Sequence, residues 1–293
     1  MLFDEYLFAD YSGAHSSNAQ RRSIRLAAAW SSRPASIVHQ RMTRAELTGE
    51  LVRRLEQATE AGRRICFGQD HQYGVPWALV EELSLDGIRW RDLIEMLATG
   101  AYGEGAPALG HPNTFAAAFN TWLTGRGSKP YFYSATKAVL YGLPRMNPRA
   151  GELTCYRLTE LRRPKSGAGS PKPFNRVGDN GTVGGQSLVG ILAIRSLLQA
   201  CARRHIRVAV WPFDGLSVTD DQYLGAHVMI EPYPSAVRVP GVIQSDESDA
   251  LACANHVREA DITGELAGLL DLSRLDAKDA AIASVEGWIV SHT

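Results

Sequence analysis

The chain has 293 residues, its 31 Lys and Arg residues are balanced by 31 Asp and Glu residues, and 45% of its residues are hydrophobic. This composition excludes an intrinsically disordered or collagen-like protein. The formal net charge of zero excludes a global attraction to nucleic acid or to an anionic membrane, so a site for a polyanion has to be local.

The cysteines and the N-terminal segment favour a cytoplasmic protein. Cys66, Cys155, Cys201 and Cys253 lie far apart, without the paired spacing of a zinc site or a redox dithiol, so we expect buried thiols in a reducing compartment. The N-terminal segment carries acids where a signal peptide would carry basic residues, and no apolar run approaches the roughly 18 residues of a membrane span. We therefore expect neither export nor a membrane span.

The first seventy residues predict a three-stranded meander, a helix and a fourth strand. A capping box of Thr43 and Glu46 opens the helix, which is expected over residues 43–62 because leucines recur there at helical spacing. The fourth strand is a buried apolar run that delivers Asp70 to its carboxyl end. The four strands are expected at residues 6–9, 23–30, 36–42 and 64–68.

Residues 71–185 are less regular, because Gly and Pro are scattered through them. We expect a loop-rich insertion that shapes a site or an interface and contains helices at 76–84 and 113–123. No repeat of solenoid length is found, so residues 1–293 are predicted to form one domain with this insertion. Further helices are expected at 186–204 and 246–259, and further strands at 206–211 and 228–231.

Acidic residues stand where predicted strands end and where a helix begins. Asp10, Asp70 and Glu231 follow apolar runs, and Asp246 and Asp249 have the i, i+3 spacing that places both on one helix face. Magnesium and manganese prefer oxygen ligands, and a two-metal site needs rigidly held carboxylates around cations about 3.5–4 Å apart. Like charges converge only if a cation or a proton compensates them. The pattern therefore predicts a site for Mg or Mn.

The order of these elements and several short motifs carry a resemblance. The motifs are FADYSG, FGQDHQYGVP, GTVGGQSL, VAVWPFDG, IEPYPSA and SDALACA. With an acid on the first strand, another on the fourth and Asp246-x-x-Asp249 on the last helix, the chain resembles the ribonuclease H-like superfamily. It is most similar to the domain of unknown function 429 family of predicted nucleases, and its helix motif looks like that of RuvC-type Holliday-junction resolvases. The resemblance covers most of the chain apart from residues near 85–150.

The resemblance implies an α/β ribonuclease H-like fold, with a mixed sheet and helices on both faces, and metal-dependent hydrolysis of a phosphodiester. The catalytic carboxylates that it indicates are Asp10, Asp70 and Asp249, with Glu231 as a less secure member. The expected metal ligands are Asp10, Asp70, Asp246 and Asp249. A second Asp-x-x-Asp-Ala pattern, at Asp276 and Asp279, is an alternative to the helix motif.

A basic segment over residues 157–176 is expected to contact the phosphates of a DNA or RNA substrate. A solvated surface loop is the alternative. The glycine-rich residues 178–185 precede a predicted helix and suit an anion cradle and a tight turn equally. The candidates for substrate binding are Arg162, Arg163, Lys165 and Arg176.

Simpler interpretations of the acids remain open. Asp10 and Asp70 are favoured turn residues, and the acids that follow Ser245 complement the positive end of a helix dipole. Two other functions also remain open. One is nucleotide-dependent phosphotransfer on a related fold, in which the glycine-rich segment grips phosphates, and the other is a binding module that has lost the chemistry.

Overall fold

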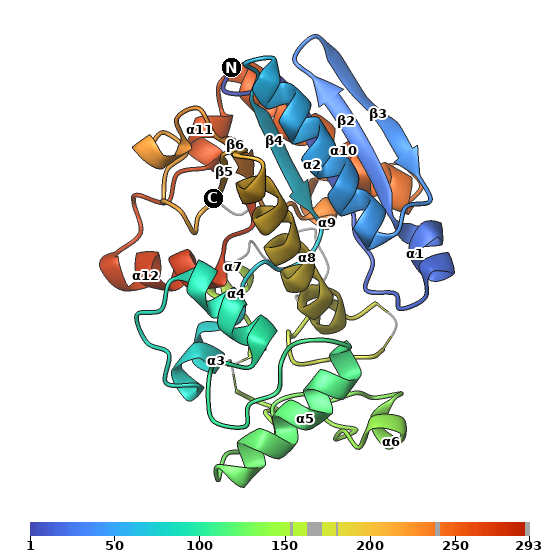
Figure 1. Cartoon of the computed structure of the whole chain (residues 1–293), viewed down its shortest axis with the longest axis vertical. Helices are drawn as coiled ribbons and strands as arrows, with labels where there is room; N and C mark the ends of the chain where they lie inside the picture. The colour runs from blue at the N-terminus through green and yellow to red at the C-terminus, as the bar shows by residue number, and fades with distance from the viewer. Residues whose placement is uncertain (153–154, 163–171, 180, 238–240, 291–293) are drawn as a thin grey trace.

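The computed structural model describes residues 1–152, 155–162, 172–179, 181–237 and 241–290, which form an α/β structure around a six-stranded mixed sheet (Figure 1). The strand order is β3-β2-β1-β4-β6-β5. β1, β2 and β3 are antiparallel neighbours, whereas β4, β6 and β5 run parallel to β1. The strands are β1 (Glu5–Asp10), β2 (Arg25–Trp30), β3 (Arg33–Gln40), β4 (Ile65–Gln69), β5 (Val208–Val210) and β6 (His227–Met229).

The predicted three-stranded meander is confirmed, but its third strand begins earlier than expected. β3 starts at Arg33 and includes Pro34, which was predicted to be part of a breaker. Because β3 is the edge of the sheet, the missing N–H of a proline is tolerated there. β6 lies between β4 and β5, so the last strand along the chain is not the edge strand.

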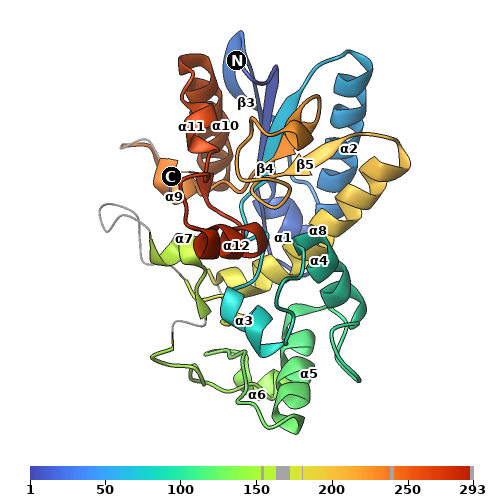
Figure 2. The same ribbon diagram turned by 90° about the vertical axis from the view of Figure 1, so that its left-hand side faces the viewer.

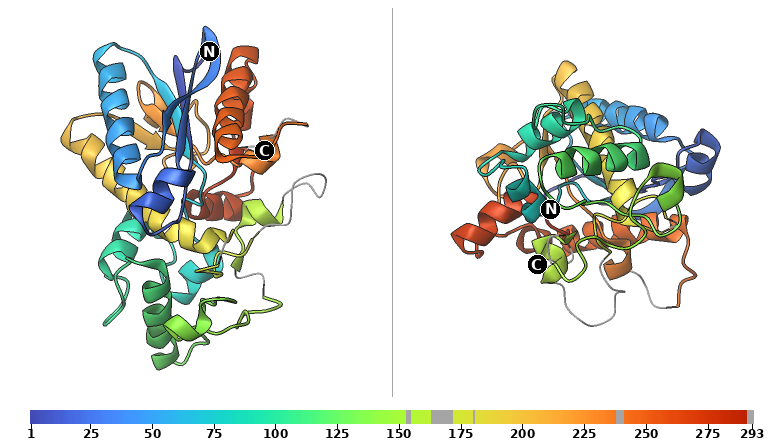
Figure 3. Two further views of the ribbon diagram at one scale, coloured as in Figure 1. Left: turned by 90° about the vertical axis from the view of Figure 1, so that its right-hand side faces the viewer. Right: turned by 90° about the horizontal axis from the view of Figure 1, so that it is seen from below.

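Helices cover both faces of the sheet, as predicted. Residues of β1 alternate: Leu7 and Ala9 pack in one apolar cluster with residues of α2 and α8, whereas Tyr6 and Phe8 pack in a second cluster with residues of α10. Figures 2 and 3 show α2 and α8 on one side of the strands and α10 on the other. The helices of these layers are α2 (Arg44–Glu60), α8 (Val183–Arg203), α10 (Asp246–Thr263) and α11 (Leu266–Leu269).

The remaining helices lie mainly in the insertion and near the ends of strands. The capping box of Thr43 and Glu46 opens α2 as predicted. The sequence did not predict α1, which precedes β2, or α4. The helices outside the two layers are α1 (Ser17–Ser23), α3 (Trp77–Glu82), α4 (Trp90–Thr99), α5 (Pro112–Gly125), α6 (Ala138–Tyr141), α7 (Leu158–Leu161), α9 (Pro234–Val237) and α12 (Ala277–Glu286), with a short 3-10 turn at Asp221–Tyr223.

The insertion at residues 71–185 is built on the same core as the sheet. Its helices α3 to α6 lie past the carboxyl end of β4 (Figure 1). Aromatic side chains such as Phe115, Phe119 and Phe132 belong to the apolar cluster that also holds Leu7. α8 joins the two parts, because it packs against α2 as well as against α4 and α5.

Two expectations about burial can be compared with the structure. All four cysteines are free and buried, as predicted. Among the described helices, α8 alone is long and apolar enough to span a membrane by length and composition, although no such span was expected. Its residues Ile191, Ile194 and Leu197 are buried in the core cluster, so this helix packs inside the fold.

Candidate active site

Asp10 and Asp70 are neighbours at the carboxyl ends of β1 and β4. These strands are parallel with Ala9 opposite Gln69, and the Asp70 N–H donates to the Ala9 carbonyl at 3.1 Å. The same register places Asp10 beside Asp70, on strands about 4.8 Å apart. Alternation along each strand places both acids on the face that carries Phe8, which is the face covered by α10.

The first turn of α10 brings two more aspartates to this face. Ser245 caps the helix, its side chain accepts from the Ser248 N–H, and its carbonyl accepts from the Asp249 N–H at 3.0 Å. The helix then packs across β1, β2 and β3. Asp249 is buried and Asp246 is partly buried at the end of the helix nearest Asp10. The capping interpretation of this acidic turn is therefore correct for Ser245, and the aspartates also face the sheet.

The charges of this group, which we call the aspartate cluster (Asp10, Asp70, Asp246 and Asp249), act on one another. Burial and then the charges of Asp70, Asp246 and Asp249 raise the pKa of Asp10 to about 9. Burial also raises the pKa of Asp246, with the Asp249 charge adding to the effect. The three elements therefore hold their acids close enough for mutual repulsion, and Asp10 is protonated at neutral pH without a compensating cation.

Arg25 is the cation that faces the aspartate cluster, and sequence reasoning missed it. It stands opposite Asp10 in the β1–β2 register, and its charge lowers the pKa of Asp10 against the effects above. Its guanidinium donates to the Ile24 and Arg22 carbonyls at 3.0 and 2.9 Å and to Glu247 at 3.4 Å. The sequence signal that could have revealed it is an arginine at the first position of β2, the strand that pairs with β1.

Gln186, in the first turn of α8, ties the loops that follow β1 and β4. Its side-chain amide donates to the Tyr11 carbonyl at 2.7 Å and to the Asp70 carbonyl. The glycine-rich segment before it packs tightly, since a Cβ at Gly184 would lie 2.1 Å from the Phe174 carbonyl oxygen. This close packing favours the tight-turn interpretation of the segment over a phosphate cradle.

Glu231, the less secure of the expected catalytic acids, lies in a buried cluster with Arg157 and Glu160. Its carboxylate accepts from the Arg157 guanidinium at 2.7 and 2.5 Å and from the Tyr73 N–H at 3.2 Å. Arg157 is fully buried and also pairs with Glu160 at 3.0 Å. Because a buried guanidinium needs such partners, Glu231 serves to neutralise Arg157 and to fasten the insertion to the end of β6.

The basic segment also differs from the expected phosphate-binding loop. Its first member, Arg157, is buried. Arg162 pairs with Asp279, and Arg176 pairs with Asp179 at 2.8 Å, so both predicted contacts to substrate already have acidic partners. The candidates that lie outside the described residues are Arg163 and Lys165.

The second Asp-x-x-Asp-Ala pattern opens α12. Asp276 caps this helix and accepts from the Asp279 N–H at 2.8 Å. α12 packs against α3, α4 and α7, whereas α10 packs on β1, β2 and β3. Only the first copy of the pattern therefore faces Asp10.

The donor set of the aspartate cluster is chemically suited to Mg or Mn, because both ions prefer carboxylate oxygens. Within the described ranges, however, no group of three or more His, Cys, Asp and Glu side chains is arranged to hold a metal ion. The protein-family models, curated proteins and solved structures with which the chain was compared contain no match. The site is therefore interpreted from its own residues.

Proposed function

We propose that the protein is a metal-dependent nuclease or a related phosphohydrolase whose aspartate cluster binds Mg or Mn. The proposal depends on one observation: four aspartates from β1, the end of β4 and the start of α10 lie at one edge of the sheet and on one face. A ribonuclease H-like fold is part of the proposal. It is supported by the antiparallel β1–β3, the parallel β4 and the helix α2 between them, an order that matches the resemblance stated above.

Charge balance supports a cation. The four carboxylates face Arg25, whose guanidinium is partly engaged by backbone carbonyls and Glu247. Without a cation Asp10 keeps its proton, because its pKa is raised to about 9. A divalent ion would take the place of that proton and relieve the repulsion.

The protein's own contribution is rigid placement. β1 and β4 fix Asp10 and Asp70 through their ladder, and the capped first turn of α10 fixes Asp249 and Asp246. Arg25 limits the negative charge on the β2 side of the cluster. The bound metal would lower the pKa of a water and stabilise the leaving oxygen of the phosphodiester. Asp10, Asp70 and Asp249 would be the catalytic carboxylates, with Asp246 as a further ligand.

The proposed substrate is DNA or RNA. Arg162 and Arg176 would reach a phosphate only by leaving their partners Asp279 and Asp179, whereas Arg163 and Lys165 remain candidates from the sequence. A cytoplasmic location is part of the proposal and is supported by the free, buried cysteines.

The test is cleavage of labelled single-stranded, duplex and branched DNA and RNA with Mn or Mg, compared with the same reactions in EDTA. Asp10→Asn and Asp249→Asn should abolish cleavage. Asp276→Asn is the matched control, because it changes the second Asp-x-x-Asp pattern and Asn caps a helix as well as Asp does. If the wild type cuts none of these substrates but releases phosphate from ATP, the nuclease proposal is wrong.

A further inference from the structure

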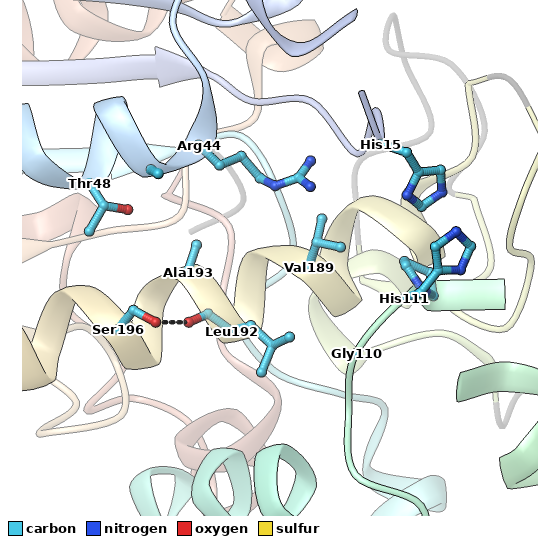
Figure 4. Close-up of a pocket in the computed structure, with 11 residues that line it drawn as sticks. His15, Arg44, Thr48, Gly110, His111, Val189, Leu192, Ala193 and Ser196 are labelled. Atoms are coloured by element: carbon cyan, nitrogen blue, oxygen red, sulfur yellow. Dashed lines mark hydrogen bonds between the residues drawn. The ribbon is translucent and has the colours of Figure 1, made fainter. Parts of the chain in front are cut away.

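A surface pocket of about 510 Å³ lies between α2, α8 and the start of α5 (Figure 4). α2 and α8 cover the face of the sheet opposite α10, and none of the four aspartates lines the pocket. Its volume is in the range of about 300–1,000 Å³ that is typical of small-molecule sites. No acidic residue is among the described residues that line it.

One end of the pocket carries three basic side chains from three elements. His15 comes from the loop after β1, Arg44 from the first residue of α2, and His111 from the residue before α5. The two imidazole rings stack in parallel, with centroids 3.9 Å apart and an angle of 9° between the planes. Figure 4 shows the Arg44 side chain extending from α2 toward His15.

Arg44 is held in place with donors to spare. Its Nη1 donates to the carbonyls of Ser12 and Ala14 at 3.0 and 2.6 Å. Its Nε and Nη2 make no hydrogen bond to any of the described residues, so these two donors are available to a ligand. The guanidinium is therefore oriented before a ligand arrives, which reduces the entropic cost of binding.

The start of α5 adds to the positive potential at this end. His111 is the N-cap and Pro112 is the first helical residue of this 14-residue helix. The His111 ring accepts weakly from the Thr114 N–H, at 3.5 Å. Burial, and then the charges of His111 and Arg44, lower the pKa of His15, so the positive charge at this end comes from Arg44 and the start of α5 rather than from a protonated His15 ring.

The rest of the pocket is apolar. Val189, Leu192 and Ala193 of α8 form its floor, and Thr48 and Ser196 place hydroxyl groups at the end away from the histidines (Figure 4). The Ser196 hydroxyl already donates to the Leu192 carbonyl at 2.9 Å, which leaves its oxygen as an acceptor. The pocket thus joins a basic end to an apolar floor.

We propose that this pocket binds a small organic phosphate monoester. The phosphate would sit among Arg44, His15 and His111, because its three terminal oxygens can accept from donors on three sides, and the organic part would cover the floor of Val189 and Leu192. The site is independent of the proposed nuclease function, since it uses none of the aspartates.

Isothermal titration calorimetry in EDTA with AMP, adenosine and inorganic phosphate tests this proposal. Wild type is expected to bind AMP at one saturable site and adenosine at least about tenfold more weakly, because charge-assisted hydrogen bonds carry the affinity. His15→Gln and His111→Asn should each weaken AMP binding by a similar factor, and Asn at position 111 retains the helix cap. His205→Gln, at an exposed position outside the pocket, is the matched control and should bind as wild type does.

The proposal would be overturned by no saturable binding of AMP, by equal binding of AMP and adenosine, or by AMP binding that neither pocket variant weakens. Binding of inorganic phosphate without AMP would also overturn it, because the floor would then have no part in recognition. A thermal melt of each variant shows that it is folded, so a loss of binding can be assigned to the pocket.

Discussion

Replacing Asp10 with Asn should stabilise the metal-free protein while destroying its activity. In the folded chain the pKa of Asp10 is raised from 3.8 to about 9, first by burial and then by the three other aspartates. Between pH 3.8 and about pH 9, Asp10 holds a proton in the folded state that it has released in the unfolded state. The free energy of unfolding therefore falls as pH rises through this window. An amide neither titrates nor repels the other carboxylates, so Asp10→Asn escapes this loss.

The size of the effect is bounded by the pKa shift. Each pH unit above the ordinary pKa of 3.8 costs at most about 1.4 kcal/mol, which limits the loss at pH 7 to about 4 kcal/mol. Because Asp10 is only partly buried, solvent screens the repulsion, and we expect about 1–2 kcal/mol. For a chain of 293 residues, that corresponds to a rise in Tm of about 2–3 °C.

Thermal melts of wild type and Asp10→Asn in EDTA, from pH 4 to pH 9, measure the difference. The two proteins should melt at similar temperatures near pH 4 and diverge as pH rises. Asp276→Asn should follow the wild type throughout, because this position caps α12 away from the cluster. If Asp10→Asn melts at or below the wild-type temperature at every pH, the four carboxylates do not crowd one another and the electrostatic argument fails.

Three further predictions concern metal binding and packing. Millimolar Mn should raise the Tm of wild type by mass action and raise that of Asp70→Asn much less; equal shifts would remove Asp70 from the ligands. Arg157→Met should lower the free energy of unfolding by about 3–5 kcal/mol in urea titrations, because it leaves buried glutamates unpaired; a loss below about 1 kcal/mol would contradict this. Gly190→Ala should lower the free energy of unfolding by about 1–3 kcal/mol, because its Cβ would lie 2.4 Å from the His71 ring. Gly49→Ala in α2, which has open space around it, should raise the free energy of unfolding by up to about 1 kcal/mol. The reverse order of these two effects would refute the packing argument.

The parts of the site that local patterns encode were predictable. Asp10 and Asp70 follow apolar runs whose alternation fixes their face, and Ser245 with its following acids marks the start of a helix. Whether these elements meet depends on strand order and helix placement, which sequence patterns leave open: β4 pairs directly with β1, and α10 packs across β1.

The parts that depend on distant partners were not predictable. Arg157 stands among glycines, prolines and other basic residues, which is typical of a solvated loop, yet its partner Glu231 is 74 positions away and the pair is buried. α4 was missed because the glycines and prolines around it obscure an amphipathic stretch whose apolar side packs into the core. The pocket of His15, Arg44 and His111 is likewise assembled from three separate elements.

The most direct test of the aspartate cluster is a crystal structure of the protein soaked in Mn, with the ion located by its anomalous scattering. The account predicts Mn bound by oxygens of Asp10 and Asp70 together with Asp246 or Asp249. A well-ordered site without Mn at millimolar concentration, or Mn bound only at other residues, would contradict it.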